Sequence, residues 1–228
     1  MSKTPATVVL VHGAWADGSS WNQVIPLLQA KGLPVVAVQL PLTSVEDDLA
    51  ATNRMLADVT GPVVLVGHSW GGMAITQAGV DPKVTGLVYV AGFAPDVGET
   101  GSSLIGAHPT PPALSTIVTD ASGFVYQTVE GMITNIAPDL PEAQARNMAV
   151  TQGRLAGAAF GQTVKVAAWK LKPTWFVLSA NDRVVSAELQ AASAERMKAK
   201  TITLQSSHMS LCSHPHEVAA VIVEAATA

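Results

Sequence analysis

Short runs of apolar, mostly β-branched residues alternate along the chain with segments of helical spacing. The apolar runs predict six strands, over residues 6–12, 34–40, 62–68, 84–91, 173–180 and 200–205. Helical spacing between and after these runs predicts helices over residues 21–30, 45–59, 188–198 and 217–226. Ser44, followed by Asp47, is a capping signal for the second of these helices. The alternation predicts an α/β fold with a mostly parallel, doubly wound sheet and helices on both faces.

The alternation breaks between about residues 95 and 170. Prolines interrupt any long element there, at positions 95, 109, 111, 112, 138 and 141. Short helical pieces such as 142–152 follow, and apolar residues including Phe124, Met132 and Phe160 need an apolar surface to cover. We therefore predict a core built from residues 1–94 and 171–228, with residues 95–170 inserted as a small cap. An elaborated surface loop is the alternative.

The composition narrows the class of protein. The chain has 228 residues, a length that fits one α/β domain. Of these residues 48% are hydrophobic and 13% are charged, a composition that suits a parallel sheet buried between helices. A net charge of −4 and scattered basic residues predict no nucleic-acid partner and no membrane partner. The chain enters its first strand without a separate apolar signal region, so we expect a cytoplasmic protein. The single cysteine, Cys212, excludes an intrachain disulfide.

Residues 67–71 read Gly-His-Ser-Trp-Gly, directly after the apolar run at 62–66. A G-x-S-x-G segment between a buried strand and a helix is typical of a nucleophile elbow. The sharp turn forces the serine into a strained backbone conformation, and the flanking glycines let the neighbouring backbone pass close by. We therefore predict that Ser69 is a catalytic nucleophile at the N-terminus of a helix that continues through residues 73–78.

A serine hydroxyl is a weak nucleophile, so Ser69 needs a histidine base and a carboxylate that orients the base. In folds with this elbow the chain order is serine, acid, histidine. His208 follows the last predicted strand and is the expected base. Asp182 follows the strand at 173–180 and is the expected acid, with Asp96, one strand earlier, as its rival.

The remaining histidines have other expected roles. His12 precedes Gly13 in the first loop, where we expect a structural hydrogen bond, and His68 is expected to point into packing. His214 and His216 flank Pro215, which is expected at the start of the last helix. No set of histidines and carboxylates has metal-ligand spacing, so we expect neither a metal nor another cofactor.

The oxyanion that forms when serine attacks a carbonyl requires preorganised N–H donors. One expected donor is the backbone N–H of Trp70, the residue after the nucleophile. The other is the N–H of Ala14, because Gly13 lets the loop after the first strand approach closely. The side chains of Trp15 and Trp70 are expected either to line the substrate pocket or to pack in the core.

With these positions located, the chain resembles the α/β-hydrolase superfamily. More narrowly, it resembles the branch that contains plant methyl esterases, plant hydroxynitrile lyases and small bacterial carboxylesterases, including pyrethroid-hydrolysing ones. The resemblance rests on residues 9–15, on residues 66–72, on the Asp182 loop, and on His208 with its following helix. It covers the core, for which it implies the α/β-hydrolase fold, and leaves the insertion uncovered.

Two further positions separate reaction types within this branch. Lyases that resemble the best-known plant enzyme carry threonine where this chain has Gly13, and lysine where it has Met209. That lysine suits cyanide as a leaving group, because a cation stabilises the departing anion, which a methionine cannot do. By this resemblance Gly13 and Met209 both favour an esterase. Gly13, Trp15 and Met209 are the candidate substrate contacts. Ser207 stands where plant relatives often have aspartate, which weakens the transfer of their substrate preferences.

The sequence thus predicts a serine carboxylesterase that cleaves small to medium apolar esters through an acyl-enzyme intermediate. One alternative is a lyase that cleaves cyanohydrins or related carbon–carbon bonds. Another is a receptor-like ligand-binding module on the same fold. The expected partner is a small-molecule ester, and the sequence leaves the oligomeric state open, a homodimer included.

Overall fold

A six-stranded parallel sheet forms the centre of the molecule. The computed structural model describes residues 5–228, so the first four residues of the predicted core segment 1–94 lie outside the described part. The strand order is β2-β1-β3-β4-β8-β9. The strands are β1 (Thr7–Val11), β2 (Val35–Val38), β3 (Val63–His68), β4 (Val84–Val90), β8 (Thr174–Ser179) and β9 (Lys200–Leu204). The prediction of six parallel strands is confirmed, each to within about two residues at its ends.

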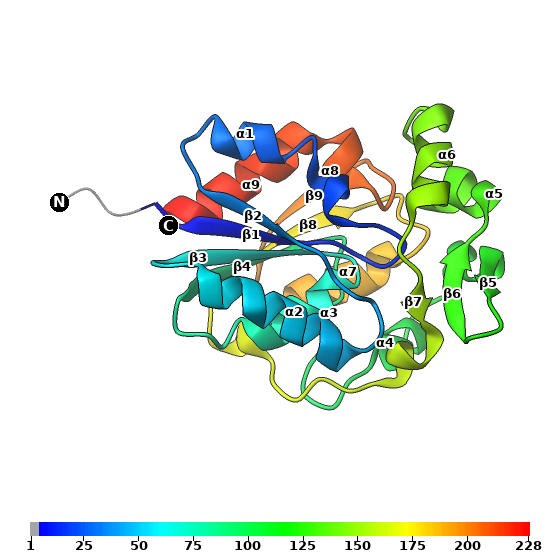
Figure 1. Cartoon of the computed structure of the whole chain (residues 1–228), viewed down its shortest axis with the longest axis horizontal. Helices are drawn as coiled ribbons and strands as arrows, with labels where there is room; N and C mark the ends of the chain where they lie inside the picture. Colours follow the sequence, from blue (N-terminus) through cyan, green and yellow to red (C-terminus); the bar gives the residue numbers. More distant parts are fainter. Residues whose placement is uncertain (1–4) are drawn as a thin grey trace.

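Helices cover both faces of this sheet, as predicted. One face carries α1 (Ile25–Gln29) and α9 (Pro215–Thr227), and the other carries α2 (Val45–Asp58), α3 (Gly71–Ala78) and α7 (Ala187–Met197) (Figure 1). The central strands β1 and β3 are apolar on both faces, and their valines and leucines are fully buried. Burial on both faces explains why these strands read as continuous apolar runs.

The helix limits differ from prediction at one place. The helix expected over 21–30 is wrong in its extent, because a 3₁₀ turn (Gly18–Trp21) precedes an α1 of five residues. Pro26 lies in the first turn of α1, where its missing N–H and its ring exclude a longer helix before it. The capping prediction for α2 is confirmed, since Ser44 Oγ accepts a hydrogen bond from Asp47 N–H at 2.9 Å.

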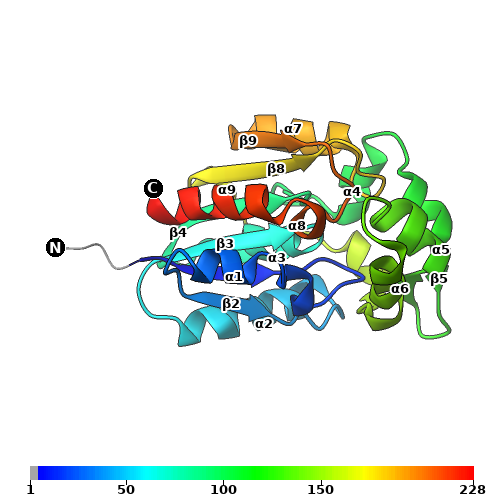
Figure 2. The same cartoon turned by 90° about the horizontal axis from the view of Figure 1, so that it is seen from above.

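The segment between β4 and β8 folds into short elements at one end of the sheet. They are α4 (Gly101–Gly106), β5 (Ile117–Thr119), β6 (Phe124–Gln127), α5 (Val129–Gly131), a π-helical turn (Met132–Ile136), α6 (Glu142–Thr151) and β7 (Leu155–Ala156). Figures 1 and 2 both place β5, α5 and α6 beyond the carboxyl ends of the parallel strands, and Figure 1 shows β6 beside β5. The helix predicted over 142–152 is confirmed as α6, whereas the antiparallel sheet β5-β6-β7 was not predicted.

This arrangement fixes where a site can form. The strand order reverses at β1, between β2 and β3, and the loops that follow β1, β3, β8 and β9 all emerge at the end where the insertion lies. Ligands in open α/β sheets bind at this end of the strands.

None of the helices within residues 5–228 combines the length and apolar character that a membrane crossing needs.

Candidate active site

Ser69 lies at the sharp turn that joins β3 to α3. Its φ is +50°, in the left-handed region that non-glycine residues rarely adopt, as predicted for a nucleophile elbow. Its backbone N–H donates to the carbonyl of Val90 at 3.1 Å, and its carbonyl accepts from Gly72 and Phe93 at 3.0 and 3.1 Å. The surrounding backbone therefore holds the strained conformation in place.

The glycines that flank Ser69 are required by close backbone contacts. A Cβ on Gly67 would lie 2.9 Å from the backbone of Gly71. A Cβ on Gly71 would lie 2.6 Å from the carbonyl oxygen of Val11 in β1. Any side chain at either position would displace backbone, as predicted for the glycines that flank Ser69.

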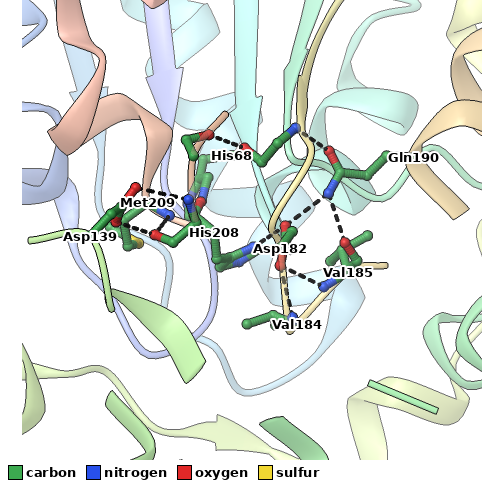
Figure 3. A network of polar contacts seen from close by, with 11 residues as sticks. His68, Asp139, Asp182, Val184, Val185, Gln190, His208 and Met209 are labelled. Carbon is green, nitrogen blue, oxygen red and sulfur yellow. Dashed lines mark hydrogen bonds and ion pairs between the residues drawn. The ribbon is translucent and has the colours of Figure 1, made fainter. Parts of the chain in front are cut away.

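His208 and Asp182 form a buried pair at the ends of β9 and β8. His208 Nδ1 lies 2.7 Å from Asp182 Oδ2, and their side chains are 3% and 0% exposed (Figure 3). In a neutral imidazole this contact places the proton on Nδ1 and leaves a lone pair on Nε2. Within residues 5–228 no hydrogen bond joins the Ser69 hydroxyl to His208. Such contacts between catalytic groups are often long in ligand-free enzymes and tighten when substrate binds.

Asp182 is held in place by three further hydrogen bonds. Its Oδ1 accepts from the N–H groups of Val184 and Val185 at 2.7 and 3.0 Å, and its Oδ2 also accepts from Gln190 Nε2 at 2.8 Å. Gln190 lies on α7 and is fully buried. Together with the contact from His208, each carboxylate oxygen of Asp182 accepts two hydrogen bonds. These bonds fix the orientation of the carboxylate toward His208. The role of Gln190 was not predicted from sequence.

His68 supports the backbone of His208 from the elbow. Its Nε2 lies 3.0 Å from the carbonyl oxygen of His208, and the two rings are 4.7 Å apart between centroids. Burial is the main cause that holds the pKa of His68 well below its usual value, so the ring is neutral and Nε2–H is the donor. The residue before Ser69 thus contacts the loop that carries His208 (Figure 3).

Asp96, the alternative acid, and His12, in the loop after β1, both contact residues outside the His208–Asp182 pair. Asp96 forms an ion pair with Lys170. His12 is buried, its Nδ1–H donates to the Gly13 carbonyl at 2.8 Å, and its Nε2 accepts from Leu40 N–H at 2.9 Å. Burial lowers the pKa of His12 and favours this neutral form. The expected structural role of His12 is confirmed.

The loop after β1 packs directly against the elbow. A Cβ on Gly13 would lie 2.7 Å from Ser69 Cβ, so glycine is needed for this approach. The next residue, Ala14, and the elbow residue Trp70 each have a backbone N–H that donates to no acceptor within residues 5–228. Trp15 N–H and Nε1–H donate to the carbonyls of Gly153 and Val125 in the insertion, both at 3.1 Å.

A small apolar cavity of about 20 Å³ lies beside Ser69. It is lined by Ala14, Trp15, Ser69, Trp70, Phe93, Ile105, Leu114, Phe160 and Val184. Both tryptophans therefore line the cavity while packing in the core. Gly13 and Met209 are not among the described residues that line this cavity. Met209 is buried directly before α8 (Ser210–Ser213), where its N–H donates to Ser207 Oγ.

The buried carboxylate of Asp48, for which no role was predicted, supports Trp70 in the lining of the cavity. Asp48 on α2 is 1% exposed, and its two oxygens accept from Trp70 Nε1–H and Leu42 N–H, each at 2.8 Å. Burial raises the pKa of Asp48 to about 6. Asp48 lies on the same helical stripe as Val45 and Thr52, so its position on an apolar face was a signal available in the sequence.

The unfolding free energy should therefore depend on pH through Asp48. The pKa of this carboxyl in the folded state lies above its value of about 3.9 in the unfolded chain. Its stabilising contribution is therefore complete below about pH 4 and is lost as pH rises through about 6. Between about pH 4 and pH 8 the unfolding free energy of wild type should fall by about 2 kcal/mol relative to Asp48→Asn. Urea unfolding of both proteins across this range measures the difference.

The neighbouring carboxylate gives a matched control for this experiment. Asp47 lies on the same turn of α2, is exposed, and has a pKa lowered mainly by hydrogen bonds from Thr43 and Ser44. Its contribution is lost as pH falls, so Asp47→Asn should show a pH dependence of the opposite sign. A wild-type minus Asp48→Asn difference that stays constant with pH would contradict the assignment to Asp48.

Comparisons with known proteins identify the family of this chain. Residues 8–221 match the alpha/beta hydrolase family, and the chain belongs to that family. A probable hydrolase of Phoma sp. is 27% identical over 98% of this chain and 99% of its own length. A pyrethroid hydrolase of Sphingobium wenxiniae is 30% identical over 45% of this chain and 41% of its own length. Relatives named as hydrolases and esterases support hydrolytic activity for this chain.

Solved structures show the same fold. The crystal structure of a pyrethroid hydrolase superposes with a TM-score of 0.86 at 24% identity, covering 99% of this chain and 98% of that one. The superposition covers the inserted segment as well as the sheet. In the described part of the chain, no group of three or more His, Cys, Asp or Glu side chains is arranged to hold a metal ion.

Proposed function

We propose that this protein is a carboxylic-ester hydrolase that acts through an acyl-enzyme intermediate on Ser69. The observation that carries the proposal is the buried 2.7 Å contact between His208 Nδ1 and Asp182 Oδ2 beside the strained elbow. A histidine in this tautomer can accept a proton at Nε2, as a serine nucleophile requires. The Asp182 carboxylate would then stabilise the imidazolium that forms.

The reaction follows from these roles. Ser69 Oγ attacks the ester carbonyl carbon while His208 Nε2 takes the hydroxyl proton, which gives a tetrahedral oxyanion. The intermediate expels the alcohol, which receives its proton from His208, and an acyl ester remains on Ser69. Water then attacks this ester with His208 again as base, and the acid product leaves with Ser69 restored.

The oxyanion would be bound by the backbone N–H groups of Ala14 and Trp70. Two observations support them: both groups lack an acceptor within residues 5–228, and the close packing of Gly13 on Ser69 brings the two loops together. Trp70 also directly precedes α3, whose N-terminal dipole favours negative charge at this point. Preorganised donors of this kind typically contribute about 3 kcal/mol each to the transition state.

The apolar surroundings of Ser69 support an apolar substrate. Residues 95–170 are proposed to act as a cap, and a groove of about 440 Å³ lies on this segment. Ile105, Leu114 and Phe160 line both the groove and the small cavity beside Ser69, so these three side chains separate the two spaces. Phe160 packs edge-on against Trp70, with 5.2 Å between ring centroids. An ester longer than the cavity would have to displace this barrier.

Removing the barrier should change chain-length preference. Phe160→Ala joins the cavity to the groove, so the ratio of kcat/KM for p-nitrophenyl octanoate to that for the acetate should rise about tenfold. Leu171→Ala, at an exposed position away from both spaces, is the matched control and should leave the ratio unchanged. An unchanged ratio in Phe160→Ala would show that long acyl groups do not pass this side chain.

The geometry around Gly13 favours the esterase over the lyase. A threonine at this position, as in the lyases named above, would bring its Cβ to within 2.7 Å of Ser69 Cβ, so the site as built does not accommodate it. Met209 is buried and places no cation at the site.

The test is turnover of a p-nitrophenyl ester series by wild type, with mandelonitrile cleavage measured in parallel. Chain-length-dependent ester hydrolysis that exceeds mandelonitrile cleavage supports the proposal. Faster mandelonitrile cleavage would indicate the lyase instead. Silence on both substrates, with retained affinity for an apolar ligand in Ser69→Ala, would indicate a ligand-binding module.

A further inference from the structure

One short segment of the insertion contacts both loops of the acid–base pair. Asp139 accepts hydrogen bonds from Ser207, at Oδ2 from the backbone N–H at 2.8 Å and at Oδ1 from the hydroxyl. Ser207 directly precedes His208. Four residues before Asp139, Asn135 Oδ1 accepts from Arg183 Nε at 2.9 Å, and Arg183 directly follows Asp182.

We propose that Asn135 and Asp139 are positioning residues, which hold the Asp182 loop and the His208 loop in register from the insertion. The proposal rests on the function proposed above, because it assigns these residues a role in aligning that same pair. They touch neither the reacting atoms nor the cavity beside Ser69. Their effect would pass through Arg183 and Ser207.

The Asp139 contact fixes the backbone on both sides of His208. Ser207 is 2% exposed, and its hydroxyl donates to Asp139 while accepting from Met209 N–H at 3.2 Å. His68 holds the carbonyl of His208 itself at 3.0 Å, so three successive residues of this loop are tied (Figure 3). Hydrogen bonds to an ionised carboxylate are stronger than those between neutral groups, which makes Asp139 the firmest of these attachments.

The Asn135 contact fixes the other loop. Asn135 is 4% exposed and lies in the π-helical turn, and its amide also donates to Thr116 Oγ1 at 3.2 Å. The backbone of Arg183 is held as well, since its carbonyl accepts from Ala113 N–H at 3.0 Å. π-Helical turns occur frequently at functional sites. Asn135 lies within this turn, and Asp139 follows shortly after the turn ends at Ile136.

The test compares Asp139→Ala, Ser207→Ala and the double variant on a p-nitrophenyl ester. We expect Asp139→Ala to lower kcat about tenfold, since displacing a catalytic group by about 1 Å can reduce the rate by up to about 100-fold. KM should change by less than about twofold, because no substrate contact is removed. The double variant should be no slower than the slower single variant, since both substitutions break the same link.

Two controls separate positioning from a general loss of structure. Asp120→Ala removes another insertion carboxylate, one paired with Arg154 at 2.7 Å, and should leave kcat unchanged. The end point of labelling by a fluorophosphonate counts intact sites, so kcat is expressed per labelled site. Asp139→Asn retains one acceptor and should give a kcat between those of wild type and Asp139→Ala.

The outcomes separate this proposal from the function on which it rests. An unchanged kcat per labelled site in Asp139→Ala, or multiplicative effects of Asp139→Ala and Ser207→Ala, would overturn the positioning role while leaving the esterase intact. Ester inactivity of wild type would instead overturn the proposed function. The downfield proton resonance of His208 Nδ1–H is a readout that does not depend on turnover. Asp139→Ala should broaden and shift it and Asp120→Ala should not; an unchanged resonance in Asp139→Ala would also overturn positioning.

Discussion

Replacing Ser69 by alanine should lower kcat for ester hydrolysis by about 10⁶-fold, and replacing His208 by alanine should lower it by a similar factor. The two groups act as a unit: without the base the hydroxyl is not activated, and without the hydroxyl the base has no nucleophile to deprotonate. The variant that lacks both should therefore be no slower than either single variant. Its residual rate would come from the oxyanion donors and from substrate binding.

The fold should survive the substitution at position 69. The Ser69 backbone is held by Val90, Gly72 and Phe93, and alanine keeps all three of these hydrogen bonds. Circular dichroism and urea unfolding check this point, and kcat for p-nitrophenyl butyrate measures the loss. If the two substitutions multiplied instead of saturating, Ser69 and His208 would act in separate steps and the proposed mechanism would be wrong.

Asp182→Asn should lower kcat by about 10⁴-fold while leaving the structure close to wild type. The amide oxygen of asparagine can still accept from the N–H groups of Val184 and Val185. Its NH₂ would then replace the oxygen that accepts from His208 and Gln190. An NH₂ donor there favours the tautomer of His208 with its proton on Nε2, and this tautomer cannot accept the serine proton.

Asp96→Asn is the matched control, because Asp96 was the rival acid in the sequence and is paired with Lys170 in the structure. It should keep kcat within about twofold, because a partly exposed ion pair contributes little and lies outside the acid–base pair. A large loss in Asp96→Asn together with a small loss in Asp182→Asn would reverse the assignment of the acid. Both variants are measured on the same ester, with active sites counted by fluorophosphonate labelling.

The parallel sheet could be predicted because its strands are buried on both faces and therefore read as continuous apolar runs. The elbow could be predicted because the glycine pair around Ser69 stands between an apolar strand and a helical segment, where close backbone contacts require glycine. His208 and Asp182 followed from chain order together with their places directly after the last two predicted strands, since the carboxyl ends of parallel strands meet at one edge of the sheet. Local pattern and fold rules agree at all of these positions.

The insertion could not be predicted in detail because its strands are too short to show a period of two. β5, β6 and β7 have three, four and two residues, and long-range pairing defines them. Asp139 lies between Pro138 and Pro141, where nothing in the local sequence indicates a contact with a residue 68 positions away. Gln190 belongs to a helix that was predicted. Its hydrogen bond to Asp182 depends on how the loop after β8 folds against that helix, which the local sequence does not indicate.

The most direct test of the central claim is detection of the acyl-enzyme. Wild type is mixed with p-nitrophenyl acetate, quenched in acid within milliseconds, digested and analysed by mass spectrometry. We predict an acetyl group on Ser69, formed together with a burst of p-nitrophenol, and no such adduct in Ser69→Ala. Steady turnover with no covalent adduct, or with the acetyl group on a different residue, would contradict the account.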